Sequence, residues 1–168
     1  MYLKSRKNNL LLIISMAVLT AILISPASSG FAQTSGDTIM LTDEQKIMNV
    51  LENLKKGAEE RNVDLYMSCF SRNFSTGNLK YENVHSDISG AFQVNENITC
   101  NFSDISINIV EETATVTYIQ DINQKNIDTG KTNGFSLNIK NTLKKEGDDW
   151  KIYSLEWSSP SKSATGKQ

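Results

Sequence analysis

The last third of the chain alternates apolar and polar residues with a period of two, and this pattern constrains the fold most. Every second residue is isoleucine over 105–109, and similar runs cover 114–118, 135–139 and 150–157. Successive side chains of a strand point to opposite faces, so these runs predict half-buried β-strands. Short polar segments separate them, and short turns join antiparallel neighbours. Turns are expected at Glu111-Glu112, 128–134 and 146–149.

The first strand of this region changes phase. Its apolar residues occupy even positions at Cys100 and Phe102 and odd positions from Ile105 onward. A regular strand cannot exchange its two faces, so we expect a β-bulge near Ser103-Asp104. The bulge would bend the sheet and make one of its faces concave.

The residues before the sheet carry helical signals. Thr42 with Gln45 three residues later matches a capping box, in which each side chain bonds the other residue's backbone N–H. Apolar residues then recur at helical spacing over 47–58, and this helix should end near Arg61. A second, shorter helix is expected with Asp64 as its cap.

A third helix is expected over 79–92, where Val84, Ile88 and Phe92 recur every four residues. Gly90 weakens this helix, and the alternative is a strand over 80–85. Helices followed by an antiparallel sheet make an α+β fold, with the N-terminal helices packed on a curved four-stranded meander. We expect this domain over 42–157, followed by a disordered tail over 158–168.

The N-terminus has the layout of a secretory signal. A basic start at 4–7 precedes the apolar run 10–24, and small residues follow up to Ala32. A helix over the apolar run would reach about 22 Å, which is short of the roughly 30 Å hydrocarbon core. We therefore expect a signal peptide over 1–32, a flexible leader over 33–41 and an exported protein, extracytoplasmic or secreted. If the signal is not cleaved, the same segment would anchor the protein in the membrane.

The charge balance bears on the partner. The chain has 17 Lys and Arg against 19 Asp and Glu, a net charge of −2, and the basic residues of the signal would leave with it. Binding to nucleic acid depends on clustered Lys and Arg, which the chain lacks. We expect no nucleic-acid partner and no contact with the membrane beyond an uncleaved N-terminus.

The two cysteines leave two interpretations open. Cys69 and Cys100 could form a disulfide in an exported protein, or remain two buried thiols. Their spacing matches no zinc site, and His85 is the single histidine. The chain also lacks a phosphate loop, a nucleophile elbow and a dinucleotide fingerprint, so we expect neither a metal nor a cofactor.

Three segments give the chain a resemblance to a known family. They are VDLYMSCFSRNF in the second helix, DISINIVEETATVTY across the first turn and LKKEGDDWKIYSLEW around the last. Over roughly 42–157 the chain resembles the nuclear transport factor 2 (NTF2)-like superfamily, which includes SnoaL-like and ketosteroid isomerase-like domains. The resemblance implies a curved sheet around a cavity, often for small apolar ligands, and frequently a dimer formed through the sheet. The chain departs from the family pattern because it shows no clear hairpin between the second and third helices.

Aromatic residues of the helices and the sheet are the candidates for lining such a cavity: Tyr66, Phe70, Phe92, Tyr118 and Trp157. His85 is a weak candidate for a general base, and a surface or packing role is the simpler interpretation.

No motif fixes a reaction, so three hypotheses remain. The favoured one is an exported, non-catalytic domain that binds a small apolar ligand or a protein in the concavity of the sheet. The second is an isomerase or dehydratase-like enzyme that uses His85 or a tyrosine–carboxylate pair. The third is a structural homodimer. An open cavity of more than about 300 Å³ would favour ligand binding, and a strongly shifted carboxylate or histidine inside it would favour an enzyme. A filled cavity with a wide apolar patch outside would favour assembly.

Overall fold

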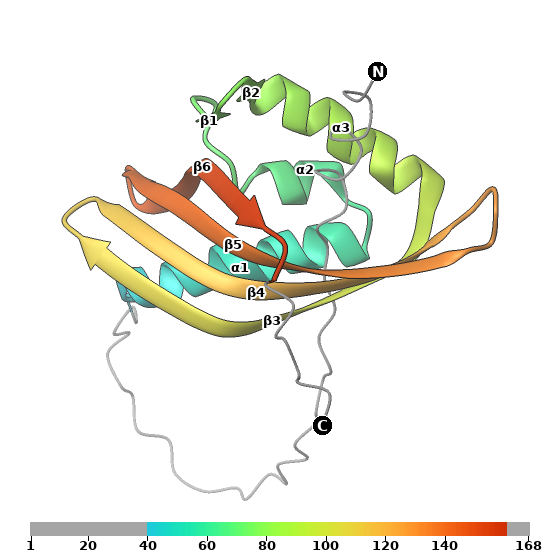
Figure 1. The fold of residues 1–168 in the computed structure, drawn as a ribbon. Coiled ribbons are helices and arrows are strands. Elements are labelled where there is room, and N and C mark those ends of the chain that lie inside the picture. Colours follow the sequence, from blue (N-terminus) through green and yellow to red (C-terminus); the bar gives the residue numbers. More distant parts are fainter. Residues whose placement is uncertain (1–39, 161–168) are drawn as a thin grey trace, which may run out of the picture.

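A computed structural model describes residues 40–160 of the chain. The predicted signal peptide, nearly all of the leader and most of the tail lie outside these residues. The predicted α+β fold is confirmed: three helices cover one face of a curved, four-stranded antiparallel sheet (Figure 1). Within 40–160 no helix is both long enough and apolar enough to span a membrane.

Helix α1, Asp43–Glu59, begins as the sequence predicts. The Gln45 N–H donates to Thr42 Oγ1 at 3.2 Å, and the Thr42 N–H donates to Gln45 Oε1 at 2.8 Å. This exchange satisfies two backbone donors that a helix start otherwise leaves exposed. The apolar stripe of α1 is buried, with Ile47 and Ala58 fully inaccessible.

The second helix, α2 over Val63–Met67, begins differently from the prediction. Its cap is Asn62, whose Oδ1 accepts from the Leu65 N–H at 3.0 Å, and Asp64 lies inside the first turn. The prediction of Asp64 was wrong because Asn and Asp cap equally well, and the backbone turn after Arg61 places Asn62 first.

Between α2 and α3 the chain forms a short hairpin that the sequence prediction missed. Strand β1, Ser75–Thr76, pairs with β2, Leu79–Lys80, around Gly77, whose φ of +57° suits a residue without a side chain. Each strand has two residues, too few to show alternation. Helix α3 then covers Tyr81–Val94, so the alternative of a strand over 80–85 was wrong.

The sheet has the order β3-β4-β5-β6, with every neighbouring pair antiparallel. The predicted bulge is confirmed, since the register of β3 shifts between Ser103 and Ser106, and Asp104 has a φ of +52°. The strands are longer than predicted: β3 (Asn95–Val110), β4 (Thr113–Asn126), β5 (Thr132–Glu146) and β6 (Asp149–Ser158).

The second predicted turn, 128–134, was too long. Residues 132–134 belong to β5 and pair with 123–125 of β4, so only 128–131 of the predicted segment lie in the turn. Asn and Gly suggested a loop, but cross-strand pairing overrides that local preference. Ser158, assigned to the tail, is the last residue of β6 and pairs with Asn138.

The two edges of the sheet are protected differently. On β6, Ile152 exchanges backbone hydrogen bonds with the segment after α2: Ile152 donates to Cys69 O at 2.9 Å and accepts from the Ser71 N–H at 3.0 Å. The Leu155 N–H on the same strand donates to Thr76 Oγ1 at 2.8 Å. Strand β3, at the other edge, pairs with β4 alone among the described residues.

The core lies between the helices and the inner face of the sheet. Trp150 is 1% exposed, and its Nε1–H donates to Asp43 Oδ1 at 3.0 Å. The Lys145 ammonium lies 2.9 Å from the same carboxylate oxygen. The first residue of α1 is thereby fixed to the β5–β6 hairpin.

Candidate functional site

Several polar side chains interrupt the apolar inner face of the sheet, and three of them form a cluster. Tyr118 and Gln120 on β4 and Asn141 on β5 occupy inward positions and are only 2–5% exposed. They lie where the helices close over the sheet, at the position of the predicted concavity. Burial of polar groups is costly unless they are hydrogen-bonded, so their partners decide what this cluster can do.

The amide nitrogens of the cluster have partners. Asn141 Nδ2 donates to the Tyr118 hydroxyl at 3.0 Å, and Gln120 Nε2 donates to Cys100 Sγ at 3.2 Å. The two amide oxygens, Asn141 Oδ1 and Gln120 Oε1, have no hydrogen-bond partner among the described residues. An unsatisfied buried acceptor costs about 1–3 kcal/mol.

The space around this cluster is small. A void of about 20 Å³ is lined by Tyr66, Phe70, Tyr118, Gln120 and Asn141, among others. A second void of about 30 Å³ lies beside it and also borders on Tyr66 and Phe70. Each has room for about one water molecule. The predicted cavity is therefore filled by side chains.

Burial keeps the ionisable groups of the interior neutral. Desolvation raises the pKa of the Tyr66 and Tyr118 hydroxyls well above the usual value. It also raises the pKa of the Cys69 and Cys100 thiols to about 12. A general base needs a pKa near the working pH, and burial shifts the pKa values of these four groups further away from it.

The structure brings together three of the five predicted cavity residues. Tyr66, Phe70 and Tyr118 border the 20 Å³ void. Phe92 is buried one layer behind, with its ring edge-on to Tyr66 at 6.1 Å between centroids. Trp157 does not reach the interior voids; it is 38% exposed and borders a separate hollow. The prediction counted aromatic side chains on the strands without knowing which of them the helices cover.

His85 does not lie in the interior. It is exposed on α3 and stacks on Tyr81, with 6.4 Å between ring centroids. The 20 Å³ void has no Asp or Glu in its lining. The 30 Å³ void is bordered by both Tyr66 and Asp87, so a tyrosine and a carboxylate both border this smaller space without an open cavity for a substrate.

The possible disulfide is not formed in this structure, since Cys69 and Cys100 are free, buried thiols. The Cys69 thiol instead donates a hydrogen bond to Val50 O, with 3.4 Å between the sulfur and the oxygen. No group of three or more His, Cys, Asp or Glu side chains within 40–160 is arranged to hold a metal ion.

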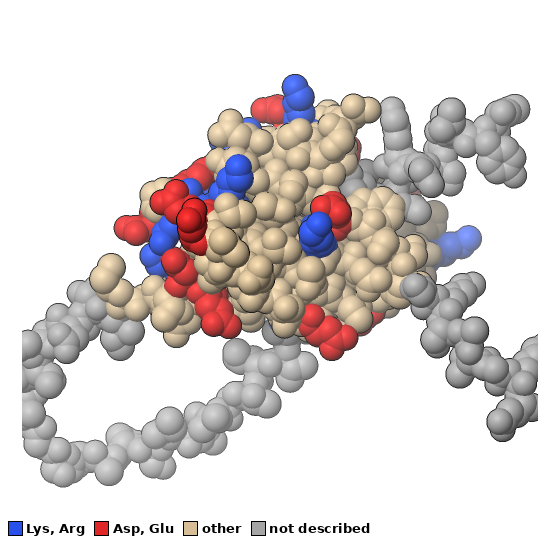
Figure 2. All heavy atoms as spheres, turned by 60° about the vertical axis from the view of Figure 1, so that its left-hand side comes forward, with Lys and Arg blue, Asp and Glu red and all other residues tan. Residues whose placement is uncertain are grey.

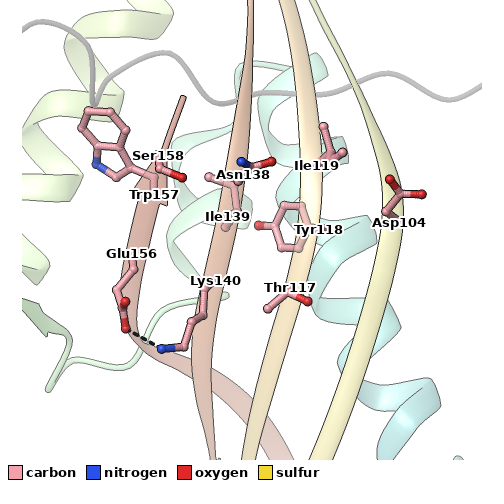
Figure 3. A pocket seen from close by; sticks show the side chains of 10 residues that line it. All are labelled: Asp104, Thr117, Tyr118, Ile119, Asn138, Ile139, Lys140, Glu156, Trp157 and Ser158. Atoms are coloured by element: carbon pink, nitrogen blue, oxygen red, sulfur yellow. Dashed lines mark hydrogen bonds and ion pairs between the residues drawn. The ribbon is translucent and has the colours of Figure 1, made fainter. Parts of the chain in front are cut away.

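An open hollow of about 470 Å³ lies on the outer face of the sheet, away from the helices (Figure 3). All four long strands contribute to it. Its walls are the outward rows of β4, β5 and β6, and the β3 bulge provides Asp104. The lining residues are Asp104, Thr117, Tyr118, Ile119, Asn138, Ile139, Lys140, Glu156, Trp157 and Ser158.

The hollow combines charge with apolar surface. Lys140 Nζ lies 2.9 Å from Glu156 Oε1, so these two charges neutralise each other. Asp104 has no ion-pair partner among the described residues, which leaves the hollow with one uncompensated negative charge. On the side of the molecule seen in Figure 2, Lys and Arg are interspersed with Asp and Glu, and much of the surface is uncharged.

Sequence reasoning missed Gln120 and Asn141. Both lie in phase with inward apolar residues, since Gln120 lies between Tyr118 and Ile122, and Asn141 lies between Ile139 and Leu143. A polar residue at an inward position is the signal that could have found them. The sequence indicated Asp104 as part of the bulge. Its place in a site could be recognised only once the register of the four strands was known.

Comparison with solved structures identifies the fold. An NTF2-like superfamily protein from Salmonella enterica serovar Typhimurium superposes with a TM-score of 0.64 at 13% identity, covering 74% of this chain and 96% of that one. A ketosteroid isomerase-like protein from Erwinia carotovora atroseptica gives a TM-score of 0.55 at 10% identity, covering 68% and 94%. At these identities the likeness concerns the fold alone, and it confirms the NTF2-like architecture.

Comparison with curated protein sequences returns no match. The model of one protein family, described as the anti-sigma-I factor RsgI9, C-terminal domain, matches residues 49–159. The match begins inside α1 and extends just past the end of β6, so it includes both the interior cluster and the outer hollow. The chain belongs to the family of the anti-sigma-I factor RsgI9 C-terminal domain.

Proposed function

We propose that this domain is an exported, non-catalytic binding module that holds a protein partner on the outer face of its sheet. The proposal rests on the contrast between very small voids inside the domain and a large hollow on its outer face. The interior voids measure about 20 and 30 Å³, far below the roughly 300 Å³ of a small-molecule site. The outer hollow offers about 470 Å³ and is open to a large partner.

The chemistry of the hollow specifies the partner's surface. Asp104 provides a negative charge without an internal counterion, so a complementary surface presents Lys or Arg there. Ile119 provides partly exposed apolar surface nearby. We infer a partner segment with a basic residue next to an aliphatic or aromatic one.

The ionisable groups support binding over catalysis. The interior tyrosines and thiols are kept neutral by burial, as described above, and the carboxylates with lowered pKa values lie elsewhere. Those of Asp43, Glu96 and Glu146 are lowered chiefly by hydrogen bonds from neighbouring side chains, which hold the structure together. None of these three borders either interior void.

The family supports a protein as the partner, because an anti-sigma factor is named for the protein on which it acts. For this chain we infer a role in signalling by contact between proteins. Export would place the domain outside the cytoplasm, so we infer that the partner is a protein of that side of the membrane and not the sigma factor itself.

The test is selection of binding peptides from a displayed random library, using the full chain purified from an exporting host. We expect the selected peptides to share Lys or Arg beside an apolar residue. Asp104→Lys and Ile119→Lys should each weaken their binding at least about tenfold, since each removes one complementary feature. Thr142→Lys, on the same face but outside the hollow, is the matched control and should bind as the parent does.

Either of two results would overturn the proposal. One is a library that yields no binder to the parent chain. The other is a set of peptides that bind the parent, Asp104→Lys and Ile119→Lys equally well. Circular dichroism of each variant establishes that a loss of binding is not a loss of folding.

A further inference from the structure

The distal half of β3 is an open sheet edge. From Ser103 to Val110 no residue is buried, although their neighbours Ala114 and Val116 on β4 are fully inaccessible. Ile105 is 37% exposed and Val110 is 61% exposed. This half of the strand therefore has apolar side chains without full cover and, on its outer side, no strand partner among the described residues.

Edges of this kind are normally protected. Natural proteins place charged residues or proline on an exposed edge strand, or cover it, because free backbone N–H and C=O groups recruit other strands. The β3 bulge between Ser103 and Ser106 protects the start of this edge, and Asp104 adds a charge there. Residues 106–110, which follow the bulge and pair regularly with β4, contain neither a charge nor a proline. The opposite edge is covered over Ile152 to Leu155, as described above, so the protein closes one edge and leaves the other available.

The sequence of this segment is symmetric in polarity. Read from either end, 105–109 alternates isoleucine, a small polar residue, isoleucine, a small polar residue and isoleucine. Antiparallel pairing of the segment with itself about Ile107 would place Ile105 opposite Ile109 and Ser106 opposite Asn108 of the second copy. Two-fold symmetric interfaces need such self-complementarity.

We propose that two copies of this chain join edge to edge through Ile105–Ile109, so that their two sheets become one continuous sheet. A second copy fits better than an unrelated strand because the segment matches itself in polarity and carries no charge that would repel its copy. The contact uses the edge of β3, so it differs from a dimer formed through the sheet face. It borders the outer hollow at one end, because Asp104, which lines that hollow, directly precedes the paired segment.

The experiment measures association of the full chain from an exporting host by sedimentation over a range of concentrations. Ser106 and Asn108 are exposed and would face each other across the symmetric contact. The double variant S106K/N108K places like charges opposite each other twice, and its dissociation constant should rise at least about tenfold. The variant S106K/N108E places opposite charges there and should associate at least as tightly as the parent.

A matched control lies one strand inward. Thr115 and Thr117 pair with Asn108 and Ser106 on the same face of the sheet, so T115K/T117K adds the same charge away from the edge. It should associate as the parent does. The proposal is overturned if the parent is monomeric at every concentration, if both charge variants associate equally, or if T115K/T117K is weakened as much as S106K/N108K.

Discussion

The inner and outer faces of the same four strands have opposite properties. Ala114, Val116 and Leu143 point inward and are fully inaccessible, whereas Thr117 and Lys140, their outward neighbours, are exposed. Alternation along a strand thus separates two tasks: one row of residues stabilises the fold, and the next row faces any partner. Substitutions on the two faces should therefore differ in what they change.

The sharpest test of this contrast uses adjacent residues of β5. Leu143→Ala should lower the free energy of unfolding by about 2–5 kcal/mol, because it removes buried methyl groups and leaves a cavity. Thr142→Ala, one residue away on the outer face, should change it by less than about 0.5 kcal/mol. Urea denaturation measures both, and equal losses would contradict the division between the faces.

Two helical glycines test how tightly the inner layer is packed. A Cβ at Gly57 would lie 2.6 Å from Tyr66 N, so Gly57→Ala should lower the free energy of unfolding; we expect a loss of about 1–3 kcal/mol. At Gly90 no atom lies within 4 Å of such a Cβ, so Gly90→Ala should raise it by up to about 1 kcal/mol through helix propensity. Thermal unfolding compares the pair, and a gain from Gly57→Ala would show that α1 and α2 pack more loosely than described.

The polar cluster tests whether the inner face depends on its hydrogen bonds. Tyr118→Phe removes the acceptor of Asn141 Nδ2 and should lower the free energy of unfolding by about 1–2 kcal/mol. The double variant Tyr118→Phe/Asn141→Leu also removes the Asn141 amide, which has lost its acceptor. It should therefore be more stable than Tyr118→Phe alone. If the double variant loses as much free energy of unfolding as Tyr118→Phe and Asn141→Leu lose together, the amide and the hydroxyl are not coupled.

The smallest effect is expected at the β5–β6 hairpin, near the surface. Hydrogen bonds from Ser71 Oγ at 2.7 Å and from the Tyr153 hydroxyl at 2.8 Å lower the pKa of Glu146 below 4.5. A pKa that is lower in the folded state contributes stability above the unfolded value, and this is lost as the pH falls through the folded one. Glu146→Gln should therefore flatten the dependence of Tm on pH below 4.5; an unchanged acid profile would contradict this.

The sequence predicted the fold well because the relevant signals are local. The alternation of the strands, the capping box at Thr42 and the phase change at Ser103-Asp104 each follow from a few neighbouring residues, and the structure contains all three. The two-residue strands β1 and β2 have too few positions to show a period. The cap at Asn62 could not be separated from Asp64 without the preceding turn.

The candidate site was less predictable because it depends on contacts between distant residues. Tyr66 and Tyr118 were expected to line an open cavity, but the volume that remains depends on how α1 and α2 close over the sheet. The role of Trp157 depended on where that cover ends. The outer hollow needs the register of four strands, which no single stretch of sequence encodes.

The fixing of Asp43 to the β5–β6 hairpin has a mechanical consequence. Asp43 follows directly on the segment through which the chain enters the domain, and its carboxylate binds both Trp150 and Lys145. Tension applied to that segment would therefore load the hairpin before it could unwind the first turn of α1.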